Sequence, residues 1–242
     1  MWLRQLTSAP QMTEPIEALL FDFGGTLDAD GVAWKERFYA HYLAEGLDMT
    51  PEAFEAVFFS ADDPLVGGLP IDTDLSGTVH ELTTSLEAEL AHTGAGIADC
   101  DRARRVASYF LADASAAFAR NRPVLEALRR RYRLGIVSNF YGNLEAVCHG
   151  TGLAPLFSAI VDSHRIGSKK PDPAIFRAAL EPLHASPEAT LLVGDSLRRD
   201  REGARRIGMG FVWVAPSEAQ VSGAQPDHPV VARLGDLAKI LL

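Results

Sequence analysis

The spacing of short apolar runs along the 242 residues constrains the fold more than any other feature of this sequence. One run, Ala18-Leu19-Leu20-Phe21, lies near the N-terminus, and the next follows only after roughly a hundred residues. The later runs are 134–137, 159–161, 191–193 and 211–214, with helical patterns between them at 143–150, 173–184 and 198–207. Short apolar runs bounded by glycine signals are typical of strands buried on both faces of a sheet. Their alternation with helices predicts an α/β fold with a doubly wound parallel sheet.

The long gap after the first strand predicts an inserted domain, because a structureless loop of that length is rare in a compact fold. Within the gap, Leu82, Leu86 and Leu90 space as one helix face, and Thr50-Pro51-Glu52 is typical of a helix start. We therefore expect an α-helical domain over residues 28–120, a core domain built from 16–27 and 121–242, and an N-terminal leader over 1–15.

Charge and composition narrow the expected partners. The formal net charge of −9 argues against a nucleic-acid surface, which needs concentrated positive charge. No apolar run is long enough to span a membrane, and the N-terminus lacks the apolar core of a signal peptide. Cys100 and Cys148 have no metal-ligand spacing, which favours two free thiols. We expect a cytoplasmic protein that acts on a small molecule; the sequence indicates no oligomeric state.

Polar residues gather in four short segments at the ends of predicted core strands. These segments are Asp22-Phe23-Gly24-Gly25-Thr26, Ser138-Asn139, Lys169-Lys170-Pro171-Asp172-Pro173 and Gly194-Asp195-Ser196-Leu197-Arg198-Arg199-Asp200. Ligands of doubly wound sheets bind at the carboxyl ends of the strands. We therefore expect the functional site to be assembled from these segments.

Taken singly, the first two segments each allow two interpretations. Asp22 precedes glycines that let a ligand approach the backbone, which suits a nucleophile or a metal ligand, but it could also cap a helix. Ser138 and Asn139 can donate hydrogen bonds to a phosphoryl oxygen, and they could equally cap the next helix.

The last two segments are ambiguous in the same way. The chain has only four lysines, and two of them stand together at Lys169-Lys170. A lysine can meet both a carboxylate and a phosphate oxygen, although a solvated loop pair is the alternative. Asp195 and Asp200 could give magnesium one direct and one water-mediated contact, because Mg²⁺ takes few protein carboxylates. Each could also be an ordinary helix cap.

Together, the four segments resemble the motifs of the haloacid dehalogenase superfamily, in the branch with an α-helical cap of type 1. The matching stretches are Phe21-Asp22-Phe23-Gly24-Gly25-Thr26-Leu27-Asp28, Val137-Ser138-Asn139, Gly167-Ser168-Lys169-Lys170-Pro171-Asp172-Pro173-Ala174-Ile175-Phe176, and Gly194-Asp195-Ser196 with Asp200. The resemblance covers roughly residues 17–215. It implies a Rossmann-like doubly wound parallel sheet core with an inserted α-helical cap domain.

The resemblance also implies a magnesium-dependent hydrolase. Asp22 would attack phosphorus and form an aspartyl-phosphate, with Lys170 as the functional lysine. Mg²⁺ would be held by the Asp22 carboxylate, the Gly24 backbone carbonyl and Asp195, with Asp200 behind a water. The phosphoryl oxygens would be held by Ser138, Asn139, Lys170 and Thr26.

The sequence departs from the family pattern at Gly24. Most phosphatases of this superfamily have a second Asp two residues after the nucleophile, which acts as general acid and base. Glycine cannot move a proton, and losing such a group typically costs about 10²–10⁴-fold in rate. The substrate could have a good leaving group such as an acyl phosphate, turnover could be slow, or a side chain of the cap could take over. The cap candidates are Asp30, His41, Asp62, Asp63 and Asp72.

Three functions remain open on this pattern. The first is a magnesium-dependent phosphatase acting on a small phosphorylated metabolite. The second is a catalytically weak or silent member that binds a phosphorylated ligand. The third is phosphonate or carbon–halogen cleavage on the same nucleophile, where Lys35, the only lysine of the predicted cap, could form a Schiff base. If the missing acid limits the rate, Gly24→Asp is expected to raise hydrolysis of aryl phosphates.

Overall fold

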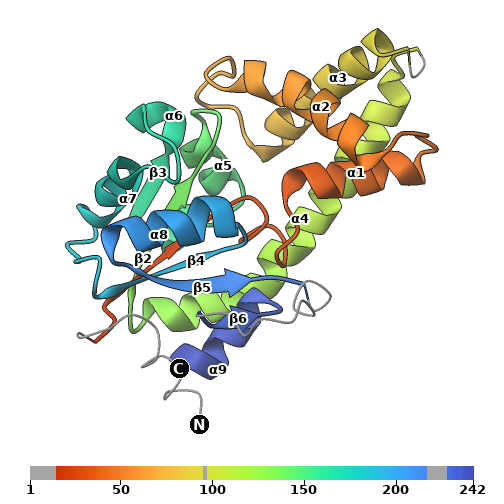
Figure 1. Ribbon diagram of the computed structural model, residues 1–242. Coiled ribbons are helices and arrows are strands. Elements are labelled where there is room, and N and C mark those ends of the chain that lie inside the picture. The colour runs from red at the N-terminus through yellow and green to blue at the C-terminus, as the bar shows by residue number, and fades with distance from the viewer. Residues whose placement is uncertain (1–14, 95–96, 217–227) are drawn as a thin grey trace.

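The computed structural model describes residues 15–94, 97–216 and 228–242. Figure 1 shows two lobes, one built around a sheet and one built of helices. Residues 1–14 of the predicted leader lie outside the described residues.

Six parallel strands form one sheet with the order β3-β2-β1-β4-β5-β6. The strands are β1 (Ala18–Phe21), β2 (Arg133–Ser138), β3 (Ala159–Asp162), β4 (Thr190–Gly194), β5 (Gly210–Val214) and β6 (Val230–Val231). This confirms the predicted doubly wound parallel sheet. The sequence analysis missed β6, because a strand of two residues carries no periodic pattern.

Alternate residues of the central strand pack on opposite faces of the sheet. Leu19 and Phe21 belong to one apolar cluster, with Leu125 of a long helix, whereas Leu20 belongs to a second cluster with Phe176. All four residues of β1 are buried, which is why the run has no polar alternation.

Helices cover both faces of this core. They are α5 (Leu144–Gly150), α6 (Ser163–Ile166), α7 (Pro173–Leu180), α8 (Glu202–Ile207) and α9 (Ala238–Leu241), with short 3₁₀ turns η3 (Ala154–Leu156) and η6 (Leu234–Leu237) and a π-helical segment η4 (Leu197–Arg201). The helix expected over 173–184 ends at Leu180, because Pro182 has no N–H to continue it. The helix expected over 198–207 begins as the π-helical segment, an irregularity that often marks functional sites.

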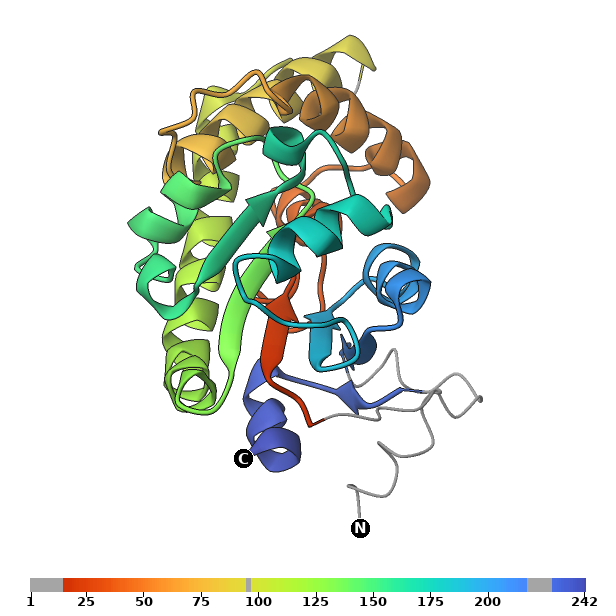
Figure 2. The ribbon, with the colours of Figure 1, turned by 90° about the vertical axis from the view of Figure 1, so that its left-hand side faces the viewer.

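The region between β1 and β2 is helical, as expected. It contains α1 (Trp34–Ala44), α2 (Pro51–Asp62), the 3₁₀ turn η2 (Asp63–Leu65), α3 (Leu75–His92) and α4 (Cys100–Arg129). Thr50 caps α2, and Pro51 occupies its first turn. Figure 2 shows this lobe over the ends toward which the strands point.

Helix α4 belongs to both lobes. Its 30 residues run from the helical lobe down beside the sheet, as Figure 1 shows. The expected boundary between residues 120 and 121 therefore falls inside one helix, and the domain limits stay a prediction. Asn121, buried in α4, donates from Nδ2 to the carbonyl of Leu27 at 3.0 Å, which ties the helix to the loop after β1. No described helix is both long and apolar enough to cross a membrane.

Candidate active site

The strand order places the predicted site at the centre of the sheet. Phe21, the last residue of β1, pairs with Ile136 of β2 and with Val193 of β4. Between β1 and β4 the strand order reverses, and the crevice at such a switch point is where ligands bind in open α/β sheets. Asp22 and Asp195 directly follow β1 and β4, and Ser138 is the last residue of β2, so parallel register alone brings the three together.

Asp22 is buried and held from two sides. Its backbone N–H donates to the carbonyl of Val193 at 2.9 Å, and its Oδ1 accepts from the Ser138 hydroxyl at 2.8 Å. The Nζ of Lys170 lies 2.7 Å from the same oxygen. Burial by itself raises the pKa of the Asp22 carboxyl, but Lys170, with help from Arg199 and Ser138, outweighs it and lowers the pKa. Asp22 is therefore ionised near neutral pH, which is the form in which a carboxyl group can act as a nucleophile or a metal ligand.

Lys170 joins two of the acidic side chains. Its buried Nζ lies 2.7 Å from Asp22 Oδ1 and 2.7 Å from Asp200 Oδ1. Burial by itself lowers the pKa of this amine, but Asp200 and Asp22 raise it above its ordinary value, so the amine stays charged. Asn139 fixes the backbone of this residue, because Oδ1 accepts from the Lys170 N–H at 2.7 Å and Nδ2 donates to the Lys170 carbonyl at 3.2 Å.

Three carboxylates converge beside Lys170. Asp22, Asp195 and Asp200 each offer an oxygen, and these oxygens lie within 4.8 Å of one another. Burial raises the pKa of Asp195 well above its ordinary value, and repulsion from Asp22 and Asp200 adds to the effect. Burial likewise raises the pKa of Asp200. A compact group of carboxylate oxygens that repel one another fits a divalent cation with oxygen ligands, such as Mg²⁺.

Two glycines make room for these acids. A Cβ at Gly25, where φ is +90°, would lie 2.7 Å from Asp195 Oδ2. A Cβ at Gly194 would lie 2.4 Å from Asp200 Oδ2. Because real Cβ contacts are longer than this, any other residue at either position would displace a carboxylate.

Two residues of the predicted site, Thr26 and Gly24, make no hydrogen bond to Asp22. The Thr26 hydroxyl is fully buried and donates to Asp195 Oδ1 at 3.2 Å, so it contacts the acidic cluster rather than the cavity. Gly24 lines the cavity, and among the described residues no hydrogen bond is made to its carbonyl oxygen. That oxygen is therefore available to an ion.

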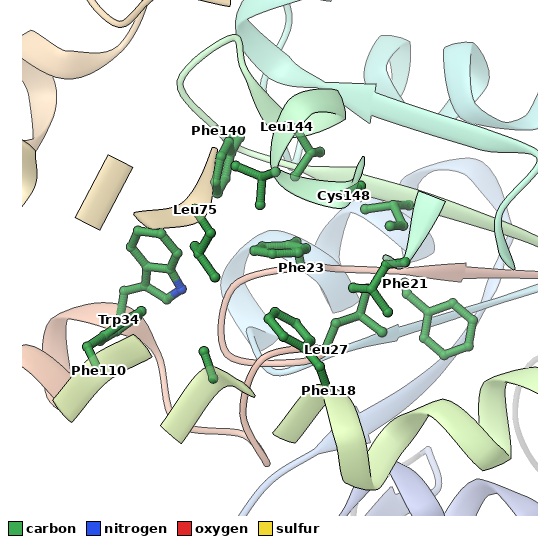
Figure 3. Packing of buried hydrophobic residues seen from close by; sticks show 14 of the residues in the cluster. Phe21, Phe23, Leu27, Trp34, Leu75, Phe110, Phe118, Phe140, Leu144 and Cys148 are labelled. Carbon is green, nitrogen blue, oxygen red and sulfur yellow. The ribbon is translucent and has the colours of Figure 1, made fainter. Parts of the chain in front are cut away.

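The space that an acid at position 24 would occupy is filled by Trp34 of α1. A Cβ built on Gly24 would lie 3.1 Å from Trp34 Nε1. The indole N–H donates to Asp28 Oδ2 at 2.7 Å, and Asp28 also accepts from Arg37 and from the backbone N–H of Gly25. Figure 3 shows the Trp34 ring beside Phe110 and Phe140, whose centroids lie 5.0 and 5.8 Å away.

A cavity of about 560 Å³ opens above Asp22 between the two lobes. The core contributes Asp22, Gly24, Ser138, Asn139, Phe140, Tyr141, Ser163, Lys169, Lys170 and Arg199, and the helical lobe and its connection to β1 contribute Ala33, Trp34, Lys35, Glu36, Phe58, Phe59, Asp62, Asp63 and Val66. Its aromatic and charged walls suit a small ligand with a charged end.

Of the five cap side chains proposed to replace the acid, the structure brings two to this cavity, Asp62 and Asp63. The other three lie elsewhere. Asp30 pairs with Arg120 at 2.7 Å, His41 lies 3.1 Å from Asp113, and Asp72 is exposed outside the cavity.

Arg199, which has no role predicted from the sequence, lies at the site. Its side chain lines the cavity. Burial by itself lowers the pKa of the guanidinium, but the charges of Asp22, Asp200 and Asp195 outweigh it and raise the pKa. The backbone N–H of Arg199 donates to the Ser196 hydroxyl at 3.2 Å, whereas its guanidinium makes no hydrogen bond or ion pair with the described residues. The signal available in the sequence was the position of this arginine one residue before Asp200.

A parallel sheet with a polar cluster at its switch point, beneath a helical lobe, is the arrangement of an α/β enzyme. Comparison with known proteins makes this specific, since the haloacid dehalogenase-like hydrolase family matches residues 16–208. The chain therefore belongs to the haloacid dehalogenase-like hydrolase family, as the motifs implied.

Individual relatives are similar to this chain over part of its length. Phosphoserine phosphatase of Thermus thermophilus is 36% identical over 121 residues, which cover 48% of this chain and 46% of that protein. Haloacid dehalogenase-like hydrolase domain-containing protein 3 of Mus musculus is 33% identical over 153 residues, 61% of each chain. The chain thus spans about half the length of these curated relatives. Among solved structures, the HAD-hydrolase YfnB of Bacillus subtilis shares the fold, with 22% identity, a TM-score of 0.55, and coverage of 94% of this chain and 99% of that one.

Proposed function

We propose that this protein is a magnesium-dependent phosphatase that hydrolyses a small phosphorylated metabolite through an aspartyl-phosphate at Asp22. The observation that carries the proposal is the surroundings of Asp22, which is buried, ionised, in contact with Lys170 and within 4.8 Å of the oxygens of Asp195 and Asp200. If Asp22 only stabilised the fold, a cation such as Lys170 would be enough, and the nearby acids Asp195 and Asp200 would have no role. The similarity to a phosphoserine phosphatase supports a phosphate ester as substrate class.

The residues fit a magnesium ion held by Asp22, the Gly24 carbonyl and Asp195, with Asp200 behind a water. When bound, the ion offsets the negative charge of nucleophile and phosphoryl group. The pKa values of Asp195 and Asp200 are raised first by burial and further by repulsion from Asp22, and a bound cation would offset both causes.

In this proposal the first step moves the phosphoryl group onto Asp22. A carboxylate oxygen of Asp22 forms a bond to phosphorus while the bond from phosphorus to the leaving oxygen breaks. Water then attacks the phosphorus of the aspartyl-phosphate, which releases phosphate and restores the carboxylate. Ser138 and Lys170 both contact Asp22 Oδ1, so they are placed to donate to phosphoryl oxygens that arrive there.

Direct phosphate binding by Asn139 and Thr26 stays a prediction. The contacts of Asn139 are with the backbone of Lys170, and the hydroxyl of Thr26 contacts Asp195. These contacts support positioning roles, in which Asn139 fixes Lys170 and Thr26 fixes an acid of the metal site.

The other chemistries on the same nucleophile are less well supported. A Schiff base requires a neutral amine, but the Nζ of Lys35 lies 2.8 Å from Glu55 and 3.5 Å from Glu36. Burial by itself lowers the pKa of Lys35, and these two acids more than offset it, so the pKa is raised and the amine stays charged. Carbon–halogen cleavage needs no metal, and the paired acids Asp195 and Asp200 would then have no role. The cytoplasmic location and the small-molecule partner stay predictions.

The decisive experiment is a screen of phosphorylated small molecules with the purified protein, with and without Mg²⁺. We expect Mg²⁺-dependent release of phosphate from at least one phosphate ester, and we expect Asp22→Asn to abolish it because the amide is not a nucleophile. Asp101→Asn is the matched control, since Asp101 is exposed and pairs only with Arg104 on the surface of α4. Turnover that survives in Asp22→Asn would refute the proposal, and a protein that binds the esters without turnover would favour the silent alternative.

A further inference from the structure

The proposed reaction needs a proton for the leaving oxygen, and the loop after β1, which carries Asp22 and Gly24, supplies none. Gly24 has no side chain, and Trp34 fills the adjacent space. Lys170 cannot serve as a general acid near neutral pH, because its two carboxylate partners raise its pKa. Asp195 and Asp200 belong to the acidic cluster. A general acid must therefore come from another wall of the cavity.

Three carboxyl groups line the cavity outside the acidic cluster, and all three belong to the helical lobe. Glu36 is 53% exposed and lies 3.5 Å from the amine of Lys35. Asp63 is exposed, whereas its neighbour Asp62 is half-buried. Burial disfavours the charged form of a carboxyl group, so Asp62 is the one of these three whose surroundings suit a proton donor.

The side chain of Asp62 is held by Tyr141, a residue of the core, although its backbone belongs to helix α2 of the helical lobe. The Tyr141 hydroxyl donates to Asp62 Oδ1 at 2.5 Å, and the Tyr141 carbonyl accepts from the backbone N–H of Gly67 at 2.9 Å. Tyr141 follows Ser138 by three residues, so the same loop orients Ser138 at Asp22 and Asp62 at the cavity. Among the described residues, Oδ2 of Asp62 makes no hydrogen bond, which leaves this oxygen to exchange a proton.

The surroundings of Asp62 make both its protonated and its ionised form accessible near neutral pH. Burial is the main cause that raises its pKa to about 6, and Asp63 adds to it, while the Tyr141 hydrogen bond and the charge of Arg199 work in the opposite direction. Lys35 and Glu36 of α1 line the same cavity but pair with each other. A group with a pKa near the working pH can both give and take a proton efficiently.

From this geometry we propose that Asp62 is the general acid and base of the reaction and replaces the side chain missing at position 24. This rests on the proposed phosphatase function. In the first step protonated Asp62 gives its proton to the leaving oxygen as the bond from that oxygen to phosphorus breaks and the bond from Asp22 to phosphorus forms. In the second step the Asp62 carboxylate takes a proton from the attacking water, so that phosphate leaves, Asp22 is a free carboxylate again and Asp62 is again protonated.

The test compares leaving groups in single-turnover experiments with Asp62→Asn and Mg²⁺. Release of an alcohol from an alkyl phosphate needs protonation, so we expect it to slow by about 10²–10⁴-fold. Release of p-nitrophenol from p-nitrophenyl phosphate needs little protonation and should change by less than tenfold, with the aspartyl-phosphate then accumulating. Asp101→Asn is the control, because Asp101 is exposed on α4 and lies outside the cavity, and it should slow neither release.

A pH profile separates this role from a merely structural one. Alkyl phosphate turnover by the unaltered protein should fall as pH rises above about 6, because the protonated form of Asp62 is lost. Tyr141→Phe removes a hydrogen bond that lowers this pKa, so the fall should move to higher pH, and in Asp62→Asn it should disappear.

Three results would overturn the inference. The first is equal slowing of both leaving groups by Asp62→Asn, and the second is unchanged alkyl phosphate release in that variant. The third is a pH profile that Tyr141→Phe does not move. In each case aryl phosphate turnover that still depends on Asp22 leaves the phosphatase proposal standing. If the unaltered protein hydrolyses no phosphate ester with Mg²⁺, both proposals fail.

Discussion

At the residue scale, the position of Gly24 shows how one contact from another lobe changes the meaning of a motif. The sequence alone suggests a vacancy where an acid could be restored. The structure shows that Trp34 Nε1 lies 3.1 Å from the place of the missing Cβ, and that Asp28 holds the indole there. The glycine and the tryptophan therefore fit each other, and the loss of the acid is part of a packed arrangement.

This contact refines the expectation for Gly24→Asp. The added side chain must push Trp34 aside, and overpacking of this kind typically costs about 1–3 kcal/mol of unfolding free energy. We expect Gly24→Asp alone to be destabilised and to gain little in aryl phosphate hydrolysis. Gly24→Asp combined with Trp34→Phe, which removes the contacting ring edge, should gain more. Rates and urea unfolding of the two single variants and the double variant provide the measurement, and additive rates would show that Trp34 does not limit the new acid.

At the element scale, a buried ion pair joins helix α1 to the loop after β1, which carries Asp22 and Asp28. Arg37 Nη1 lies 2.7 Å from Asp28 Oδ2, with 7% and 0% of the two side chains exposed. The guanidinium also lies 3.8 Å from the centre of the Phe110 ring on α4. Because Asp28 also accepts from Gly25, this network links α1, α4 and the loop that carries Asp22.

Removing one partner of this pair should destabilise the fold strongly. We expect Arg37→Met to cost about 3–5 kcal/mol of unfolding free energy, because it leaves the Asp28 carboxylate buried without its counter-ion. Arg104→Met is the matched control, since the pair of Arg104 with Asp101 is exposed and should contribute less than about 1 kcal/mol. Urea unfolding of both variants measures the difference, and equal effects would contradict a special role for the Asp28 network.

At the scale of the whole molecule, the site joins two lobes that the chain connects twice. The acids lie at the ends of core strands, whereas Trp34 and Asp62 come from the helical lobe. Helix α4 runs through both lobes, and the hydrogen bond from Asn121 to Leu27 ties it to the loop after β1. Stability of the whole fold and occupancy of the acidic cluster should therefore be coupled.

A bound divalent ion should raise the stability of the entire protein. An ion that binds only the folded state contributes about 2.7 kcal/mol at a concentration one hundred times its Kd. We expect Mg²⁺ to raise the Tm, and Asp195→Asn to remove most of the shift, whereas Asp101→Asn should retain it. A thermal unfolding series over Mg²⁺ concentration tests this, and a shift of equal size in Asp195→Asn would place the ion elsewhere.

The sequence by itself determined five of the six described strands, their parallel arrangement and the four polar segments. These features are local, because a buried strand needs a continuous apolar run and a strand-end ligand site needs glycine and a polar residue beside it. Asp22, Lys170, Asp195 and Asp200 were accordingly found from short stretches of chain, and the structure brings them together.

Only the tertiary structure decided what surrounds that cluster. Three features arise where lobes or loops meet: the contact of Trp34 with Gly24, the hydrogen bond of Tyr141 to Asp62, and the position of Arg199 beside the acidic cluster. Tyr141 and Asp62 are 79 positions apart. No periodicity or spacing records such a contact, since it depends on how α1 and α2 pack over the sheet. The physical reason is that burial and neighbouring charge, which set the protonation of a carboxyl, are properties of the assembled cavity.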